Sequence, residues 1–89
     1  MGDIITFNNL KVGDIALVLK IYADSHALKR RIMDMGITKG VVVKVVRTAP
    51  LGDPLEVEVR GYMLSLRKED LALIQGKLLS RKEQKEVFK

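Results

Sequence analysis

The sequence predicts a mainly β fold, a small, closed or nearly closed barrel of about five antiparallel strands with one inserted α-helix. Three observations lead to this prediction. Short segments rich in Val, Ile and Leu alternate between apolar and polar residues, the period of a strand with one buried face. These segments follow one another at close spacing, as in small barrels. One segment, at about residues 25–35, instead has the period of a helix.

The first predicted strand covers residues 13–22 and opens with a Gly-Asp turn signal. Its strict alternation divides the side chains between two faces, because successive residues of a strand point in opposite directions. One face is expected to carry Ile15, Leu17, Leu19 and Ile21.

Residues 24–36 follow with a different period. Leu28, Ile32 and Met35 are spaced as one stripe of a helix of about three turns. Asp24 or Ser25 can cap the N-terminus, and Gly36 can close the C-terminus in a left-handed conformation. The basic residues of this helix are expected to turn away from the core: Lys29, Arg30 and Arg31.

The remaining strands are predicted from alternation and β-branched residues. Residues 40–47 and 54–61 form the next pair, with Leu55, Val57 and Val59 facing inward on the second. Residues 62–66 follow after a tight bend at Gly61. A polar connector at 67–70 leads to a final short strand at 71–75.

The composition favours one small domain with an aliphatic core. The chain has 89 residues, 47% of them hydrophobic, with no Trp. It has no Cys, which excludes disulfides, thiolate metal sites and cysteine nucleophiles and fits a reducing cytosol. No secretory signal is visible, and no apolar run approaches the ~20 residues of a membrane helix. We therefore expect a cytoplasmic protein without membrane insertion.

Residues 76–89 are interpreted as a basic tail after a domain at 1–75. Much of the net charge of +5 lies in this segment. Ser80 and Glu83 have the spacing of a capping box, which predicts a short helix. A frayed, solvated terminus is the alternative, and both interpretations stay open at this point.

The side chains offer little for catalysis or metal binding. His26 is the only imidazole, and its neighbour Ser25 is poorly placed for a nucleophile–base pair, because successive helical side chains diverge by about 100°. His26 and Asp24 are the candidate metal ligands, but two ligands at one helix start do not make a site. We therefore predict that the chain is not an enzyme.

The segment "APLGDP" (residues 49–54) is interpreted as a hairpin loop. It lacks the Lys and the following helix of a phosphate-binding loop, and its two prolines remove N–H donors. Gly52 suits a left-handed turn position. Leu51 is an apolar residue in a turn, and it either packs under the end of the barrel or binds a partner.

The basic helix face does not predict nucleic-acid binding. Nucleic-acid binders on small barrels interleave aromatic and basic residues. In this chain the aromatics are scattered, at Phe7, Tyr22, Tyr62 and Phe88. A solvated face or an acidic protein partner is favoured, and no nucleic-acid partner is expected.

Two long strings of this sequence resemble the FeoA family. They are "LKVGDIALVLKI" and "LKRRIMDMGITKGVVVKVVRTAPLGDPLEVEVRGYMLSLRKED", which together run from about Leu10 to Ile74. The most specific parts are "RRIMDMGI" with the following Gly40, "APLGDPLEV" and "RGYMLSLRKED". The last departs from the pattern at Asp70, where the family often has Ala.

This resemblance implies an SH3-like barrel with a non-enzymatic role in bacterial ferrous iron uptake. The implied partner is the cytosolic part of FeoB, a membrane permease with a GTPase domain, which would recruit the chain to the inner face of the membrane. The implied role is interaction with, or regulation of, that transporter. Our candidate contact residues are Lys29, Arg30, Arg31, Leu51, Gly52 and Asp53.

The resemblance also supports a second hypothesis. A related SH3-like domain forms the C-terminus of DtxR-type repressors, so the chain is alternatively a stand-alone domain that binds or senses a transition metal such as Fe²⁺ or Zn²⁺. A homodimer is also possible, because small barrels with a long hairpin can exchange strands between copies.

Overall fold

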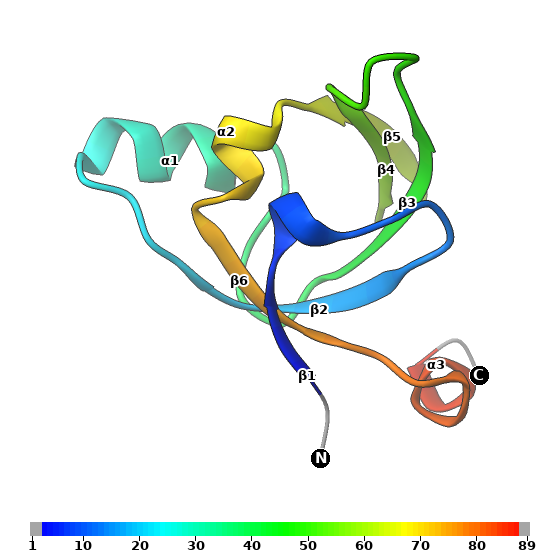
Figure 1. Ribbon diagram of the computed structural model, residues 1–89. Coiled ribbons are helices and arrows are strands. Elements are labelled where there is room, and N and C mark those ends of the chain that lie inside the picture. Colours follow the sequence, from blue (N-terminus) through cyan, green and yellow to red (C-terminus); the bar gives the residue numbers. More distant parts are fainter. Residues whose placement is uncertain (1–2, 88–89) are drawn as a thin grey trace.

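The computed structural model describes residues 3–87 as one bent six-stranded antiparallel sheet with short helices around it (Figure 1). The strand order is β1-β6-β2-β3-β4-β5, and the sheet is not closed, since β1 and β5 are its edges. The predicted mainly β, barrel-like fold is therefore confirmed, with six strands in place of about five. In chain order the elements are β1 (Asp3–Thr6), η1 (Phe7–Asn9), β2 (Ile15–Ile21), α1 (His26–Asp34), β3 (Val42–Thr48), β4 (Leu55–Val59), β5 (Tyr62–Leu66), α2 (Lys68–Leu71), β6 (Ile74–Leu78) and α3 (Arg81–Val87).

The core is aliphatic, as predicted, apart from one aromatic ring. Three of the short helices each contribute one fully or nearly fully buried side chain, Phe7 from η1, Ile32 from α1 and Leu71 from α2. These pack with the strands' inward residues into one cluster. This burial orients α1 and α2 on the sheet, because each helix has little else to bury.

Strand β2 differs from its prediction. Ala16 and Val18 are fully buried, whereas Leu17 and Leu19 are only half-buried. The pairing of β2 with β6 shifts register between Val18 and Lys20, so that the core face changes along the strand and Ile21 is buried beyond the shift. The prediction from alternation was wrong because a β-bulge, which no local sequence pattern indicates, exchanges the buried and the outward face of the strand.

Helix α1 agrees with the predicted helix. The Oγ of Ser25 accepts a hydrogen bond of 3.1 Å from the backbone N–H of Leu28, which caps the N-terminus. Ile32 is buried, and Met35 packs partly against the core. Gly36 follows with a φ of 97°, a left-handed conformation that ends the helix.

The hairpin of β4 and β5 is also as expected. Leu55, Val57 and Val59 are buried, while Glu58 is exposed. The two strands are joined by two residues, Arg60 and Gly61, with φ values of 51° and 87°. Two successive positive φ values match the type I′ turn, whose twist suits a tight hairpin.

The predicted final strand at residues 71–75 is wrong. Leu71 ends α2, and β6 runs from Ile74 to Leu78, between β1 and β2. Gly76, the first residue of the predicted tail, lies inside this strand. A Cβ at this position would collide with the Leu17 carbonyl oxygen and the Phe7 ring, so the glycine makes room for the ring.

The last described segment is helical. Ser80 and Glu83 exchange the two hydrogen bonds of a capping box, of 3.0 and 3.2 Å, at the start of α3. The backbone N–H of Leu79 donates to the Ile15 carbonyl oxygen, and Leu79 is buried. The division between residues 1–75 and 76–89 stays a prediction, although β6 continues through it.

Candidate partner-binding surface

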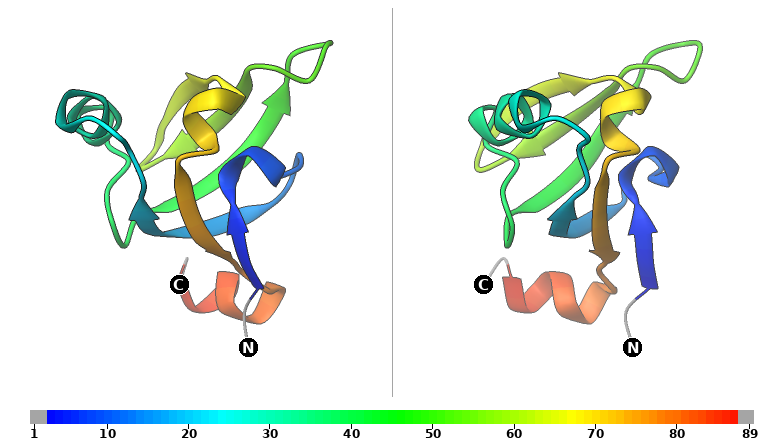
Figure 2. Two further views of the ribbon diagram at one scale, coloured as in Figure 1. Left: turned by 60° about the vertical axis from the view of Figure 1, so that its left-hand side comes forward. Right: turned by 90° about the vertical axis from the view of Figure 1, so that its left-hand side faces the viewer.

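The two predicted contact regions, α1 and the loop at residues 49–54, lie on opposite sides of α2 at one end of the molecule (Figures 1 and 2). These three elements are here called the α2 rim. Helix α2 connects the other two elements. A nitrogen of the Arg31 guanidinium lies 3.0 Å from a carboxylate oxygen of Asp70. On the other side of α2, the backbone N–H of Lys68 donates a hydrogen bond of 2.8 Å to the Asp53 carboxylate.

The loop between β3 and β4 is a compact turn that presents one side chain outward. The N–H of Gly52 donates to the Ala49 carbonyl oxygen over 2.8 Å. The N–H of Ala49 donates to the Pro54 carbonyl oxygen over 3.0 Å. These bonds hold Leu51 at the tip, where the residue is 97% exposed. Of the two alternatives considered for Leu51, packing under the end of the barrel is excluded, because the side chain points outward.

The three basic residues of α1 have different surroundings. All are exposed, but Arg31 pairs with Asp70, so its charge is partly compensated. The Arg31 side chain is 62% exposed and that of Asp70 17%, so water screens the pair mainly from the Arg31 side, and a pair of this kind contributes about 1 kcal/mol. Among the described side chains, residues 4–85, neither Lys29 nor Arg30 forms a salt bridge. These two cations are therefore the ones available to a partner.

A groove next to this helix was missed by the sequence reasoning. It lies between α1, the second half of β2 and the turn at residues 38–41. Leu19, Ile21 and Met33 line it together with three lysines, of which only Lys29 was a candidate; the others are Lys20 and Lys39. No sequence signal pointed to this groove, because its walls come from three separate segments.

The candidate metal ligands do not complete a site. Asp24 and His26 are both exposed at the start of α1. Where the structure describes the side chains, at residues 4–85, no group of three or more His, Cys, Asp or Glu is placed to hold a metal ion. A structural zinc site takes four protein ligands and a catalytic site three. The two residues therefore do not fit a metal centre without further ligands.

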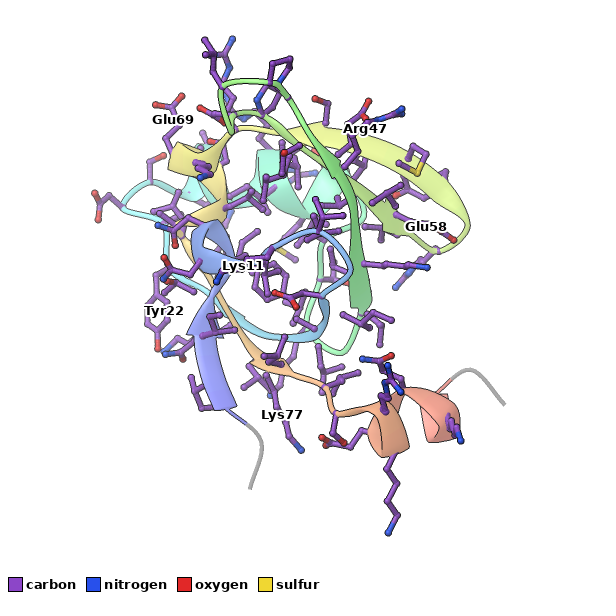
Figure 3. The ribbon with its side chains drawn as sticks, turned by 45° about the vertical axis from the view of Figure 1, so that its right-hand side comes forward. Lys11, Tyr22, Arg47, Glu58, Glu69 and Lys77 are labelled. Atoms are coloured by element: carbon purple, nitrogen blue, oxygen red, sulfur yellow. The ribbon has the colours of Figure 1, made fainter. Side chains whose placement is uncertain are left out.

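The clearest electrostatic perturbation lies at the other end of the molecule. Glu83 accepts a hydrogen bond from the Lys77 ammonium, and the N–H and hydroxyl of Ser80 stabilise its charged form further; together they lower its pKa from 4.5 to about 2. Lys77 lies beside α3, far from Glu69 on the α2 rim (Figure 3). The pair holds α3 to β6 and takes no part in the candidate surface.

These features define a small SH3-like module with a bent antiparallel sheet, an outward-facing loop and a cationic helix face. No helix among residues 3–87 has the length and apolar character needed to span a membrane. The chain belongs to the FeoA family, since the model of the FeoA domain matches residues 5–78. The expected family membership is thus confirmed.

Two similar proteins support this assignment. The chain is 36% identical over 73 residues to an Fe(2+) transport protein A/Fe(2+) transporter FeoB fusion protein of Porphyromonas gingivalis. That alignment covers 82% of this chain but only 8% of the fusion protein. The NMR structure of a FeoA-like protein from Clostridium acetobutylicum is 36% identical, with a TM-score of 0.81 over 91% of this chain and 93% of the other.

Two further structures bear on the expectations about metals and repressors. A crystal structure of Stenotrophomonas maltophilia FeoA complexed with zinc, described as a prokaryotic SH3 domain protein, is 27% identical, with a TM-score of 0.70 over 81% of this chain and 88% of the other. A manganese-dependent transcriptional repressor with bound manganese is 16% identical, with a TM-score of 0.79 over 89% of this chain and 38% of the repressor. The second likeness is one of fold alone.

Proposed function

We propose that this chain is a non-enzymatic accessory module of ferrous iron uptake that binds the cytosolic part of a FeoB-type transporter. One observation carries the proposal: in the Porphyromonas gingivalis relative, one polypeptide unites an Fe(2+) transport protein A with FeoB. Fusion keeps two domains at high effective concentration, which is useful when they act together. The chain would accordingly work in the cytoplasm, at the inner face of the membrane.

The α2 rim is the proposed contact surface. Leu51 is a large apolar side chain on a turn that backbone hydrogen bonds hold in place, so little backbone conformational entropy is lost when it enters a pocket of a partner. Lys29 and Arg30 add positive charge on the neighbouring helix, which favours an acidic surface opposite. Gly52 shapes the turn and Asp53 ties it to α2, so these two residues act by positioning Leu51.

The test is direct binding between this chain and the purified soluble GTPase-bearing part of a FeoB-type transporter. Calorimetry with GTP, with GDP and without nucleotide would show whether the complex depends on the nucleotide state. We expect a one-to-one complex in at least one of these states. Absence of heat and of co-elution in all three, with and without Fe²⁺, would overturn the proposal.

The second candidate function is that of a transition-metal-responsive domain. It is favoured by the zinc in the Stenotrophomonas maltophilia relative. Because Asp24 and His26 supply only two donors, this function needs ligands from a second molecule, such as another copy of the chain or the transporter. Titration with Zn²⁺ and Fe²⁺ distinguishes it: micromolar or tighter binding that His26→Ala abolishes would support it, and its absence would remove it.

A further inference from the structure

The groove between α1 and β2 is built by the bulge in β2. The register shift between Val18 and Lys20 takes Leu19 out of the regular alternation, and bulges commonly redirect a side chain in this way. Leu19, which is half-buried, then forms an apolar lining with Met33 of α1, which is 42% exposed, and the buried Ile21 lies at the base. These three residues come from elements that meet only in the folded chain.

The third wall is the turn at residues 38–41. The N–H of Val41 donates to the Thr38 carbonyl oxygen over 3.1 Å, and Gly40 has a φ of 91°, as the third position of a type II turn requires. Hydrogen bonds from the Gly40 N–H to Val18 O and from the Val18 N–H to Val41 O hold the turn on β2. This arrangement places Lys39 at the margin of the groove.

The groove therefore has an apolar lining with three lysines around it. Lys20, Lys29 and Lys39 come from three different elements, and none of them forms a salt bridge with the side chains that the structure describes, those of residues 4–85. No carboxylate lines this groove. Like charges gathered without counter-charges repel one another, so a bound anion would relieve this repulsion as well as attract each lysine.

We propose that this groove binds an acidic segment of the protein partner, with one apolar side chain between Leu19, Ile21 and Met33 and flanking carboxylates facing the three lysines. The proposal deepens the proposed function, on which it rests, since the partner is the transporter's cytosolic part. It differs from a contact at Leu51 alone, because the groove adds charge complementarity that sets the orientation of the complex.

The chemistry of the groove favours a protein segment over nucleic acid. A single-stranded nucleic acid would need exposed aromatic faces for base stacking. The aromatic residue next to the groove is Tyr22. The Lys20 ammonium lies over its ring, 4.8 Å from the centre, and so covers one face on which a base could stack. The Tyr22 hydroxyl also donates to the Gln75 side chain over 3.2 Å. An apolar lining instead suits an aliphatic side chain of a peptide.

The experiment compares variants of the full chain for binding to the purified GTPase-bearing part of a FeoB-type transporter. The groove variant is Lys20→Glu combined with Lys39→Glu, and Met33→Ala tests the apolar lining separately. The matched control is Lys11→Glu combined with Lys44→Glu, which makes the same change in net charge at two exposed lysines outside the groove. All of these side chains are exposed, and thermal unfolding followed by circular dichroism verifies that each variant is folded.

The proposal expects the groove variant to bind about tenfold more weakly or worse, and the control within about twofold of the original chain. Met33→Ala is expected to bind a few-fold more weakly with an unchanged salt dependence. Equal binding by the groove and control variants would overturn the groove proposal and leave the proposed function intact. No binding by the original chain would overturn both the groove proposal and the proposed function. The groove proposal would also be overturned if the original chain bound a single-stranded DNA oligonucleotide and only the groove variant lost that binding.

Discussion

The hydroxyl of Tyr62, at the start of β5, donates a hydrogen bond of 2.6 Å to the carbonyl oxygen of Met35, at the end of α1. This bond satisfies one of the carbonyl groups that a helix leaves unpaired at its C-terminus. It also connects α1 to β5, one of the two edge strands of the sheet. The next residue, Gly36, lies so close to the same hydroxyl that a Cβ at this position would collide with it.

Loss of this hydroxyl should therefore loosen α1. We expect Tyr62→Phe to lower the free energy of unfolding by about 1 kcal/mol, the usual contribution of one hydrogen bond. Urea unfolding measures the change. Tyr22→Phe is the matched control, since its longer bond of 3.2 Å joins two side chains and satisfies no carbonyl group at a helix end, so it should matter less. An equal effect of the two substitutions would contradict the assigned role of Tyr62.

Gly76 should tolerate no side chain. Its φ is not in the left-handed region, so the cost of Gly76→Ala comes from the collision with the Leu17 carbonyl oxygen and the Phe7 ring. We expect a destabilisation of about 3 kcal/mol, because a strand and a buried ring must both shift. Gly13→Ala is the comparison: that position has a φ of 93° but open space around it, and strain alone should cost about 1 kcal/mol.

Leu51 should matter for binding and not for folding. Because the residue is 97% exposed, Leu51→Asp is expected to change the free energy of unfolding by less than about 0.5 kcal/mol. The same substitution should weaken the complex with the transporter's cytosolic part by about tenfold or more, since it replaces an apolar anchor with a charge. Val12→Asp alters another exposed apolar residue, 56% exposed, and serves as the control. Unaltered binding by the Leu51 variant would remove this residue from the proposed contact surface.

The attachment of α3 should depend on pH. The folded state lowers the pKa of Glu83 from 4.5 to about 2, chiefly through its hydrogen bond with Lys77. A lowered pKa means that the stabilisation is fully present above pH 4.5 and is lost as the pH falls through about 2. Hydrogen exchange of the α3 amides should accordingly increase in this interval relative to the β4 amides. Glu83→Gln should abolish the pH dependence, and its persistence in that variant would assign it to another group.

The local sequence pattern was sufficient to predict β4 and α1, because the signals for these elements lie within or next to their own residues. The alternation at residues 55–59 predicts β4, because one wet and one packed face impose a period of two. Helix α1 was predicted with its cap at Asp24 or Ser25, of which the structure has Ser25, and with its end at Gly36, because both signals act within one turn of the residue that carries them. The outward direction of Lys29 and Arg30 followed from the same helical period.

Contacts between distant segments explain what local pattern missed. The pairing of β1 with β6, the bulge in β2 and the passage of β6 through Gly76 each depend on a partner at least ten residues away. The same holds for the candidate surface: Arg31 and Asp53 meet α2 from opposite sides, and Lys20 and Lys39 join Lys29 at one groove only when β2, α1 and the following turn are packed together. The amino-acid order alone thus specified the family, the fold class and elements such as α1 and β4, because the signals for these elements are short in range. The direction of Leu51 and the existence of the groove required the folded chain, because exposure and side-chain proximity are properties of packing.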